Sequence, residues 1–163
     1  MKGNKETRKQ GNKETRESLF VSLFPCFLVY FRYQRPTMDR QAYIDFLLDH
    51  YENPRCYCEM ADADASAQGA NPGCGDVVTI YLKVTGDGRI AAISFVGDGC
   101  TISLAGASIA TEMLAGKTLA AVEETPAEAI LDLMGREIAA TRLKCATLGL
   151  NTAKDAARRL ANP

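Results

Sequence analysis

The sequence predicts an α+β fold, in which a small antiparallel β-sheet is packed by helices. Two patterns lead to this prediction: two β-branched runs in the middle of the chain, and apolar residues at helical spacing before and after them. The runs cover 77–84 and 90–96, and the Gly-Asp-Gly turn at 86–88 joins them into a β-hairpin. Any third strand must come from the segment before Cys74.

Helices are expected on both sides of the hairpin. The first covers 39–52, where Asp39 can cap the N-terminus and Asn53-Pro54 ends the helix. The polar segment 55–73 is expected to be mostly loop. Beyond the hairpin, apolar periodicity predicts a helix that ends at Gly116, a single turn at 119–123, a helix opened by Pro126 and a last helix at 146–161.

Charge is distributed unevenly along the chain. Residues 1–37 contain eight Lys/Arg and three Glu, a net of +5, whereas residues 38–163 contain eleven Lys/Arg and seventeen Asp/Glu, a net of −6. We therefore expect one domain, 38–163, preceded by a distinct N-terminal extension. The acidic domain argues against nucleic acid as a partner, because phosphate binding requires a basic surface.

The extension begins with a polar tandem repeat, GNKETR at 3–8 and 11–16, which indicates disorder. The apolar run 19–31 has 13 residues, too few to span a bilayer as a helix, and no small-x-small cleavage site follows it. The alternatives are an export signal, a peripheral membrane anchor, or an upstream start assigned ahead of a true start at Met38. We favour the last and expect no stable membrane association.

The chain contains six cysteines, an even number that is compatible with disulfides. Disulfide frameworks are typical of small secreted domains with poor cores, whereas this chain has enough apolar residues to build a core. Three of the cysteines lie beside glycine or a charged residue, which favours reactive or metal-binding thiols. The six are Cys26, Cys56, Cys58, Cys74, Cys100 and Cys145.

The three candidate ligand cysteines lie at the ends of predicted elements. Cys74 lies between two glycines just before the first hairpin strand, and Asp76 can offer an oxygen ligand two residues later. Cys100 follows the second strand and begins a helix, whose positive dipole end favours the thiolate. Cys145 also meets the start of a helix, with Lys144 adding positive charge. If the hairpin brings these segments together, the four ligands suit tetrahedral zinc or a cluster with mixed ligands.

The spacing of these cysteines, 26 and 45 residues apart, matches no zinc-finger pattern. The alternative for each is a small buried apolar residue, which the sequence Gly-Cys-Gly-Asp around Cys74 disfavours. For the single histidine, His50, we expect a surface or capping role, so histidine-based catalysis is not indicated.

The cysteine segments together resemble those of the IscU/NifU/SufU family of iron–sulfur cluster assembly scaffolds. The similar segments are YENPR at 51–55, NPGCGD at 71–76, GDGC at 97–100 and KCATL at 144–148, and the similarity covers nearly all of 38–163. The resemblance implies a three-stranded antiparallel sheet packed by helices. It also implies that Cys74, Asp76, Cys100 and Cys145 bind a transient 2Fe–2S cluster or zinc.

The family's activity implies a cytoplasmic, non-enzymatic scaffold that accepts sulfur as persulfide from a cysteine desulfurase. Iron and electrons would come from other donors, and the cluster would pass to carriers or apo-proteins. We expect Cys145, beside Lys144, to accept the persulfide, with Cys74 as its rival. Cys56 and Cys58 are either extra sulfur-relay thiols or incidental loop residues.

Two departures from the IscU pattern place the chain within the family: the basic residue before the third cysteine resembles SufU, and the changed upstream segment argues against a dedicated chaperone as partner. Lys144 replaces the histidine that IscU proteins have before the third cysteine, and IAATR at 138–142 replaces the LPPVK segment that a dedicated chaperone recognises. The insertion that SufU proteins carry between their second and third cysteines is absent. The hypotheses, in order of preference, are a cluster scaffold, a zinc-dependent sulfur acceptor of sulfurtransferase type, and a structural zinc domain.

Overall fold

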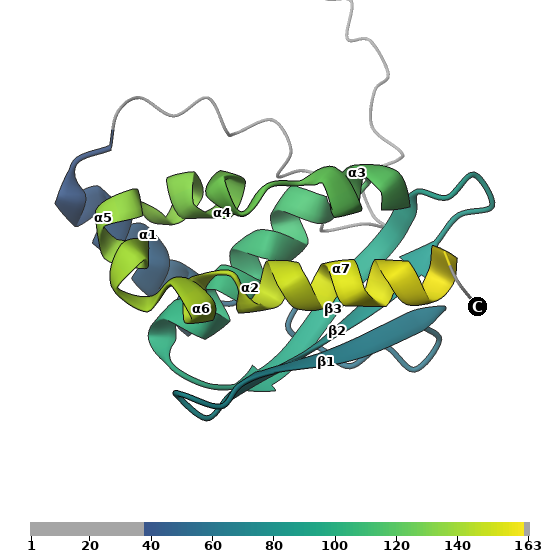
Figure 1. The fold of residues 1–163 in the computed structure, drawn as a ribbon, viewed down its shortest axis with the longest axis horizontal. Coiled ribbons are helices and arrows are strands. Elements are labelled where there is room, and N and C mark those ends of the chain that lie inside the picture. The colour runs from purple at the N-terminus through teal and green to yellow at the C-terminus, as the bar shows by residue number, and fades with distance from the viewer. Residues whose placement is uncertain (1–37, 162–163) are drawn as a thin grey trace, which may run out of the picture.

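The computed structural model describes residues 38–161 and shows a three-stranded antiparallel sheet with helices packed against one face (Figure 1). The strands β1 (Ala65–Asn71), β2 (Asp76–Val84) and β3 (Ile90–Asp98) lie side by side in chain order. The predicted α+β class and the hairpin of β2 and β3 are confirmed. The third strand comes from the segment before Cys74, as expected.

Two long helices cover the sheet. The helix α2 packs on β3, and α7 crosses β1 and β2, while α1 packs against α2 at one end of the molecule (Figure 1). Short helices connect α2 to α7. The bounds are α1 (Arg40–Glu52), α2 (Thr101–Leu114), α3 (Leu119–Glu124), α4 (Ala127–Met134), α5 (Arg136–Ala139), the 3₁₀ helix η2 (Ala140–Arg142), α6 (Leu143–Ala146) and α7 (Leu148–Ala161).

The predicted helices form, with one interruption. Asp39 caps α1 by accepting the Ala42 N–H at 2.8 Å, as its position predicts. The predicted last helix at 146–161 is confirmed as α7, which begins two residues later at Leu148, after a break at Thr147 that separates it from α6. Packing explains the break: the Ala146 carbonyl lies against Gly106 of α2, only 2.7 Å from the position that a Cβ would occupy there.

The prediction that 55–73 is mostly loop is wrong for its second half, which forms β1. This strand consists of small and polar residues with little intrinsic preference for a strand. It forms because it pairs with β2 along its whole length and packs under α7. At Gly69 the contact is so close that a Cβ would lie 2.0 Å from the Thr152 Oγ1 atom. Long-range packing therefore creates a strand that local pattern does not reveal.

The core lies between the sheet and the α2–α7 layer. Alternate residues of β2, namely Val78, Ile80 and Leu82, are fully buried, as expected for a strand with one covered face. Phe95 of β3 and Ile109 of α2 add the larger side chains. This core holds the ends of β2 and β3 in fixed positions, and the candidate ligands lie at those ends.

The expectation of a surface or capping role for His50 is wrong, because only 1% of this residue is exposed. Its Nδ1 atom lies 2.8 Å from the Ser108 Oγ atom, and its Nε2 atom lies 3.7 Å from a carboxylate oxygen of Glu112. The Ser108 Oγ atom also accepts the Arg55 backbone N–H at 2.8 Å. Because its polar atoms are bonded, the imidazole can be buried, and it ties the end of α1 to α2.

The predicted extension, 1–37, lies outside the described residues, and so does Cys26. Among the helices of residues 38–161, none is both long enough and apolar enough to cross a membrane.

Candidate metal centre

Three segments that are distant in sequence meet at one end of the sheet. Cys74 lies in the turn between β1 and β2, and Asp76 is the first residue of β2. Cys100 follows β3 and is the N-cap of α2, while Cys145 comes from α6. The strand register explains the first meeting, because β2 begins opposite both the end of β1 and the end of β3. The hairpin therefore brings Asp76 to Cys100, as the sequence predicts.

The ligand atoms lie at distances that suit a single ion. The Sγ atoms of Cys74 and Cys145 are 3.3 Å apart, and with an Asp76 oxygen they form a group within 4.8 Å. The Cys100 Sγ atom lies 3.5 Å from Asp76 Oδ2. Two sulfurs bound to one tetrahedral metal at about 2.3 Å are separated by roughly 3.8 Å. Cys74, Asp76 and Cys145 thus form a group that suits one metal ion, whereas Cys100 lies outside this group and adjoins it through Asp76.

Asp76 joins the metal centre to the start of α2. Its side chain is buried, and its Oδ1 atom accepts the Cys100 backbone N–H at 2.9 Å. Burial alone would raise the pKa of Asp76, but hydrogen bonds from the Cys100 N–H, the two neighbouring thiols and Ser103 hold it below its usual value. Asp76 is therefore ionised and ready to bind a cation. Gly99 permits this contact, because a Cβ there would lie 3.0 Å from Asp76 Oδ1.

Cys145 differs from the expectation based on its neighbours. It lies inside the short helix α6 rather than at the start of a long one, and only 1% of it is exposed. Burial, followed by hydrogen bonding to Asp76 and Cys74, raises the pKa of Cys145 to about 12. The prediction that Lys144 favours a Cys145 thiolate is therefore wrong for the thiol by itself. A bound metal ion would favour the thiolate, because a coordinating thiol is deprotonated.

Cys74 is the exposed member of the centre. Gly75 follows it with a φ of 77°, a conformation that favours glycine and shapes the turn, and the Cys74 sulfur lies 3.3 Å from that of buried Cys145. Cys145 supplies a buried anchor and Cys74 an accessible one, which gives incoming sulfur or metal an approach from solvent.

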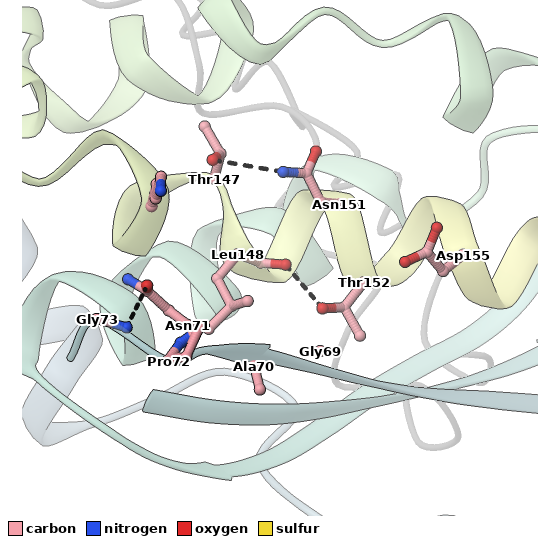
Figure 2. A pocket seen from close by; sticks show the side chains of 11 residues that line it. Gly69, Ala70, Asn71, Pro72, Gly73, Thr147, Leu148, Asn151, Thr152 and Asp155 are labelled. Atoms are coloured by element: carbon pink, nitrogen blue, oxygen red, sulfur yellow. Dashed lines mark hydrogen bonds between the residues drawn. The ribbon is translucent and has the colours of Figure 1, made fainter. Parts of the chain in front are cut away.

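Asn71 is a functional residue that sequence reasoning missed. Its Nδ2 atom donates to the Cys145 Sγ atom at 3.2 Å. Its Oδ1 atom accepts the Gly73 N–H at 3.2 Å (Figure 2). Its backbone carbonyl accepts from the N–H groups of Cys74 and Gly75. One residue therefore shapes the Cys74 turn and holds the Cys145 sulfur. Its position at the start of NPGCGD was the available signal.

Arg142 is the second residue that was missed. The charges of Cys100 and a hydrogen bond to it, then the charges of Cys74 and Cys145, raise the pKa of this exposed guanidinium. A positive group that interacts with all three cysteines favours negative charge at this centre. The signal in the sequence was a cation three residues before Cys145.

Lys144, the predicted helper of Cys145, lines a groove beside the centre. The groove lies between the end of β1 and the face of α7, has a volume of about 460 Å³, and includes Asn71, Thr147 and Asn151 (Figure 2). The remaining cysteines of the described chain, Cys56 and Cys58, are not part of the Cys74–Asp76–Cys145 group and lie in the loop after α1.

Comparison with known proteins gives a consistent result. Residues 42–162 match the model of the NifU-like N-terminal domain family. The chain is 38% identical over 117 residues to the iron–sulfur cluster assembly scaffold protein IscU 1 of Archaeoglobus fulgidus, which covers 72% of each chain. It is 33% identical to the IscU scaffold protein of Azotobacter vinelandii, covering 72% of this chain and 92% of the relative.

Solved structures show the same fold. A SUF-system scaffold protein from Fervidobacterium islandicum superposes with a TM-score of 0.58 at 27% identity, covering 69% of this chain and 94% of that one. The N-terminal part of a NifU-like protein from Brucella abortus gives a TM-score of 0.60 at 20% identity, covering 73% and 97%. The match over 42–162, the relatives and the shared fold agree, and the chain therefore belongs to the NifU-like N-terminal domain family, which it shares with IscU scaffolds.

Proposed function

We propose that this chain is a scaffold on which iron–sulfur clusters are assembled, with Cys74, Asp76, Cys100 and Cys145 as the ligands. The observation that carries this proposal is the convergence of three thiols and one carboxylate from separate segments at one end of the sheet. The names of the IscU relatives support it. The product of assembly stays bound until it is handed on, so the protein acts as a carrier rather than an enzyme.

The four ligands have different tasks in this proposal. Buried Cys145, whose sulfur accepts a hydrogen bond from Asn71, binds the cluster on the protein side, and Cys100 binds it at the start of α2. Asp76 supplies an oxygen, which is a poorer match than thiolate for iron in a cluster. A transient cluster, of the 2Fe–2S type, is therefore released most easily from the Asp76 side.

Sulfur arrives as a persulfide on a cysteine desulfurase. The Cys74 thiolate attacks the outer sulfur, the S–S bond to the desulfurase cysteine breaks, and that cysteine leaves as a thiolate. Cys74, rather than the expected Cys145, is now proposed as the first acceptor, because Cys74 is exposed whereas Cys145 is buried and has a raised pKa. Arg142 offsets the negative charge of the new persulfide.

The proposal requires partners for each component. A cysteine desulfurase supplies sulfur, separate donors supply iron and electrons, and carriers or apo-proteins receive the cluster in the cytoplasm. No nucleic acid takes part, in keeping with the net charge of −6 on residues 38–163.

The test is anaerobic reconstitution of the full chain with a cysteine desulfurase, cysteine and ferrous iron. After desalting, iron, zinc and acid-labile sulfide are measured per chain. We expect iron and sulfide in equal amounts, and loss of both in Cys100→Ala but not in the matched control Cys26→Ser. A chain that retains iron and sulfide without Cys100 contradicts the ligand set.

A zinc-dependent sulfur acceptor is the second candidate, and one observation favours it. Cys74, Asp76 and Cys145 already lie within 4.8 Å of one another, which suits a single tetrahedral ion. In that case the same experiment gives one retained zinc, sulfur as persulfide only, and faster turnover of the desulfurase. Persulfide lost in Cys74→Ser but kept in Cys145→Ser would assign the first acceptor.

A further inference from the structure

The sequence Cys56-Tyr57-Cys58 forms a fixed loop along the outer edge of β3. The Phe95 N–H donates to the Cys56 carbonyl at 3.0 Å, and Tyr57 forms an isolated bridge with Phe95. The Tyr57 ring packs edge-on against the Phe95 ring, with centroids 5.1 Å apart. The loop is therefore attached to the strand rather than moving independently of it.

The backbone of this loop turns tightly between its two cysteines. The Cys58 N–H donates to the Cys56 carbonyl at 3.1 Å, which is the hydrogen bond of a three-residue γ-turn. Consecutive Cα atoms are about 3.8 Å apart, and the turn folds two such steps to less than the roughly 6.8 Å that a disulfide tolerates. Cys56 itself has a φ of 55°, an unusual value for a residue with a side chain. Cys58 is exposed and Cys56 is half-buried.

The loop lies at the same end of β3 as the metal centre. The Tyr57 hydroxyl donates to the Gly97 carbonyl at 2.9 Å, and Gly97 precedes Cys100 by only three residues. The chain thus has exposed cysteines in two loops that both adjoin β3 or the metal centre, Cys58 in this loop and Cys74 in the turn before β2. Cys74 belongs to the candidate ligand set, and Cys58 has no role in it.

Cluster assembly has an electron requirement that a second thiol pair would meet. The outer sulfur of a persulfide is at the oxidation level of elemental sulfur, whereas a cluster contains sulfide. Each sulfur must therefore gain two electrons, and two thiols that close to a disulfide release two electrons.

We propose that Cys56 and Cys58 form a dithiol that reduces persulfide sulfur to sulfide, a role that rests on the proposed assembly function. The Cys58 thiol takes the outer sulfur of a donor persulfide, R–S–SH, to give R–SH and a Cys58 persulfide. The Cys56 thiol then attacks the inner sulfur of Cys58, forming the Cys56–Cys58 disulfide and releasing H₂S. Sulfur and hydrogen balance in both steps, the pair is oxidised, and the outer sulfur is reduced.

The test uses glutathione persulfide as the only sulfur source, without iron or desulfurase. It therefore reports on the pair even if cluster assembly fails. All chains carry Cys74→Ser, because Cys74 and Cys145 lie 3.3 Å apart and form a competing pair. Released sulfide is measured under anaerobic conditions. Remaining thiols are then alkylated, and cleavage after Arg55 and after Glu59 isolates residues 56–59 for mass spectrometry.

We expect about one sulfide per chain and a 56–59 peptide that has lost two hydrogens. Cys56→Ser and Cys58→Ser should each release at least tenfold less sulfide, whereas the control Cys26→Ser should match its parent. Sulfide release that is unchanged in both serine variants overturns the proposal. A 56–59 peptide that is alkylated at both cysteines after sulfide release also overturns it, because the electrons then came from elsewhere.

Discussion

Gly106→Ala tests how closely the metal centre depends on the contact between α2 and α6. Glycine within a helix costs about 1 kcal/mol relative to alanine, so the substitution would stabilise an isolated α2. In the folded chain, however, the new Cβ would lie 2.7 Å from the Ala146 carbonyl oxygen and 3.5 Å from the Met134 sulfur. The carbonyl belongs to backbone next to Cys145, so it cannot turn aside as a flexible side chain would.

The size of the effect follows from this distance. A carbon and an oxygen in ordinary contact are at least about 3.2 Å apart, so the α6 backbone must move by roughly 0.5 Å. Overpacking of a core costs about 1–3 kcal/mol, and the gain in helix propensity offsets about 1 kcal/mol of it. We expect a net loss of about 1 kcal/mol. Because a site loses function when its ligands move by about 0.5 Å, we also expect about tenfold weaker zinc binding.

Two measurements check this reasoning. Urea unfolding gives the free energy of unfolding, and competition with a chromophoric chelator gives the zinc affinity of the same samples. Gly86→Ala is the matched control, because its Cβ would meet nothing within 4 Å and its φ is not positive. Gly86→Ala should leave both quantities nearly unchanged. If Gly106→Ala is more stable than the wild type and binds zinc equally well, the close contact at Ala146 does not position Cys145.

Three further predictions concern buried polar groups. In Asp76→Asn the free energy of unfolding at pH 7 should fall by about 1 kcal/mol. Because folding lowers the pKa of Asp76, the ionised carboxylate stabilises the fold above the unfolded pKa of about 3.9. Urea unfolding across pH should show the difference between the two proteins closing as pH falls through the folded pKa. Iodoacetamide at pH 8 should alkylate exposed Cys58 well before Cys145, which is buried with a pKa of about 12. Peptide mass spectrometry measures both rates, and unfolding the chain should make them similar. Equal rates in the folded protein would contradict the burial of Cys145. Ser108→Ala should lower the free energy of unfolding by about 2 kcal/mol and the melting temperature by several degrees, because it removes the buried hydrogen-bond partner of His50. An unchanged melting temperature would show that this hydrogen bond is not formed.

The fold was predictable where pattern is local and strong. The runs 77–84 and 90–96 are rich in β-branched residues, and the Gly-Asp-Gly turn joins them. The hairpin could therefore be predicted, and so could the positions of Cys74 and Cys100 at its ends. The strand β1 lacks such a pattern, because its stability comes from pairing with β2 and from the close approach of α7 at Gly69. The residue pattern placed any third strand in the segment before Cys74 without bounds, and the family resemblance implied that one is present.

The sequence pointed to candidate ligands that lie near one another in the fold, but it did not show their environment. Charge near a cysteine suggested a thiolate at Cys145, but burial depends on how α6 packs against Gly106, which one-dimensional spacing cannot show. The same applies to His50, whose burial depends on Ser108, 58 residues away. Asn71 and Arg142 were missed because their tasks, holding one sulfur and facing three, appear only when distant segments meet.

The two oxygens of Asp76 point to different neighbours, and this division has a consequence for cargo release. Oδ1 accepts the backbone N–H of Cys100, the N-cap of α2, while Oδ2 faces the Cys100 sulfur. The carboxylate can therefore give up a cation through one oxygen and keep the helix start bonded through the other. In the proposed function, loading and unloading would then need no local refolding, and one molecule could serve many rounds of delivery without exposing its core to aggregation or proteolysis.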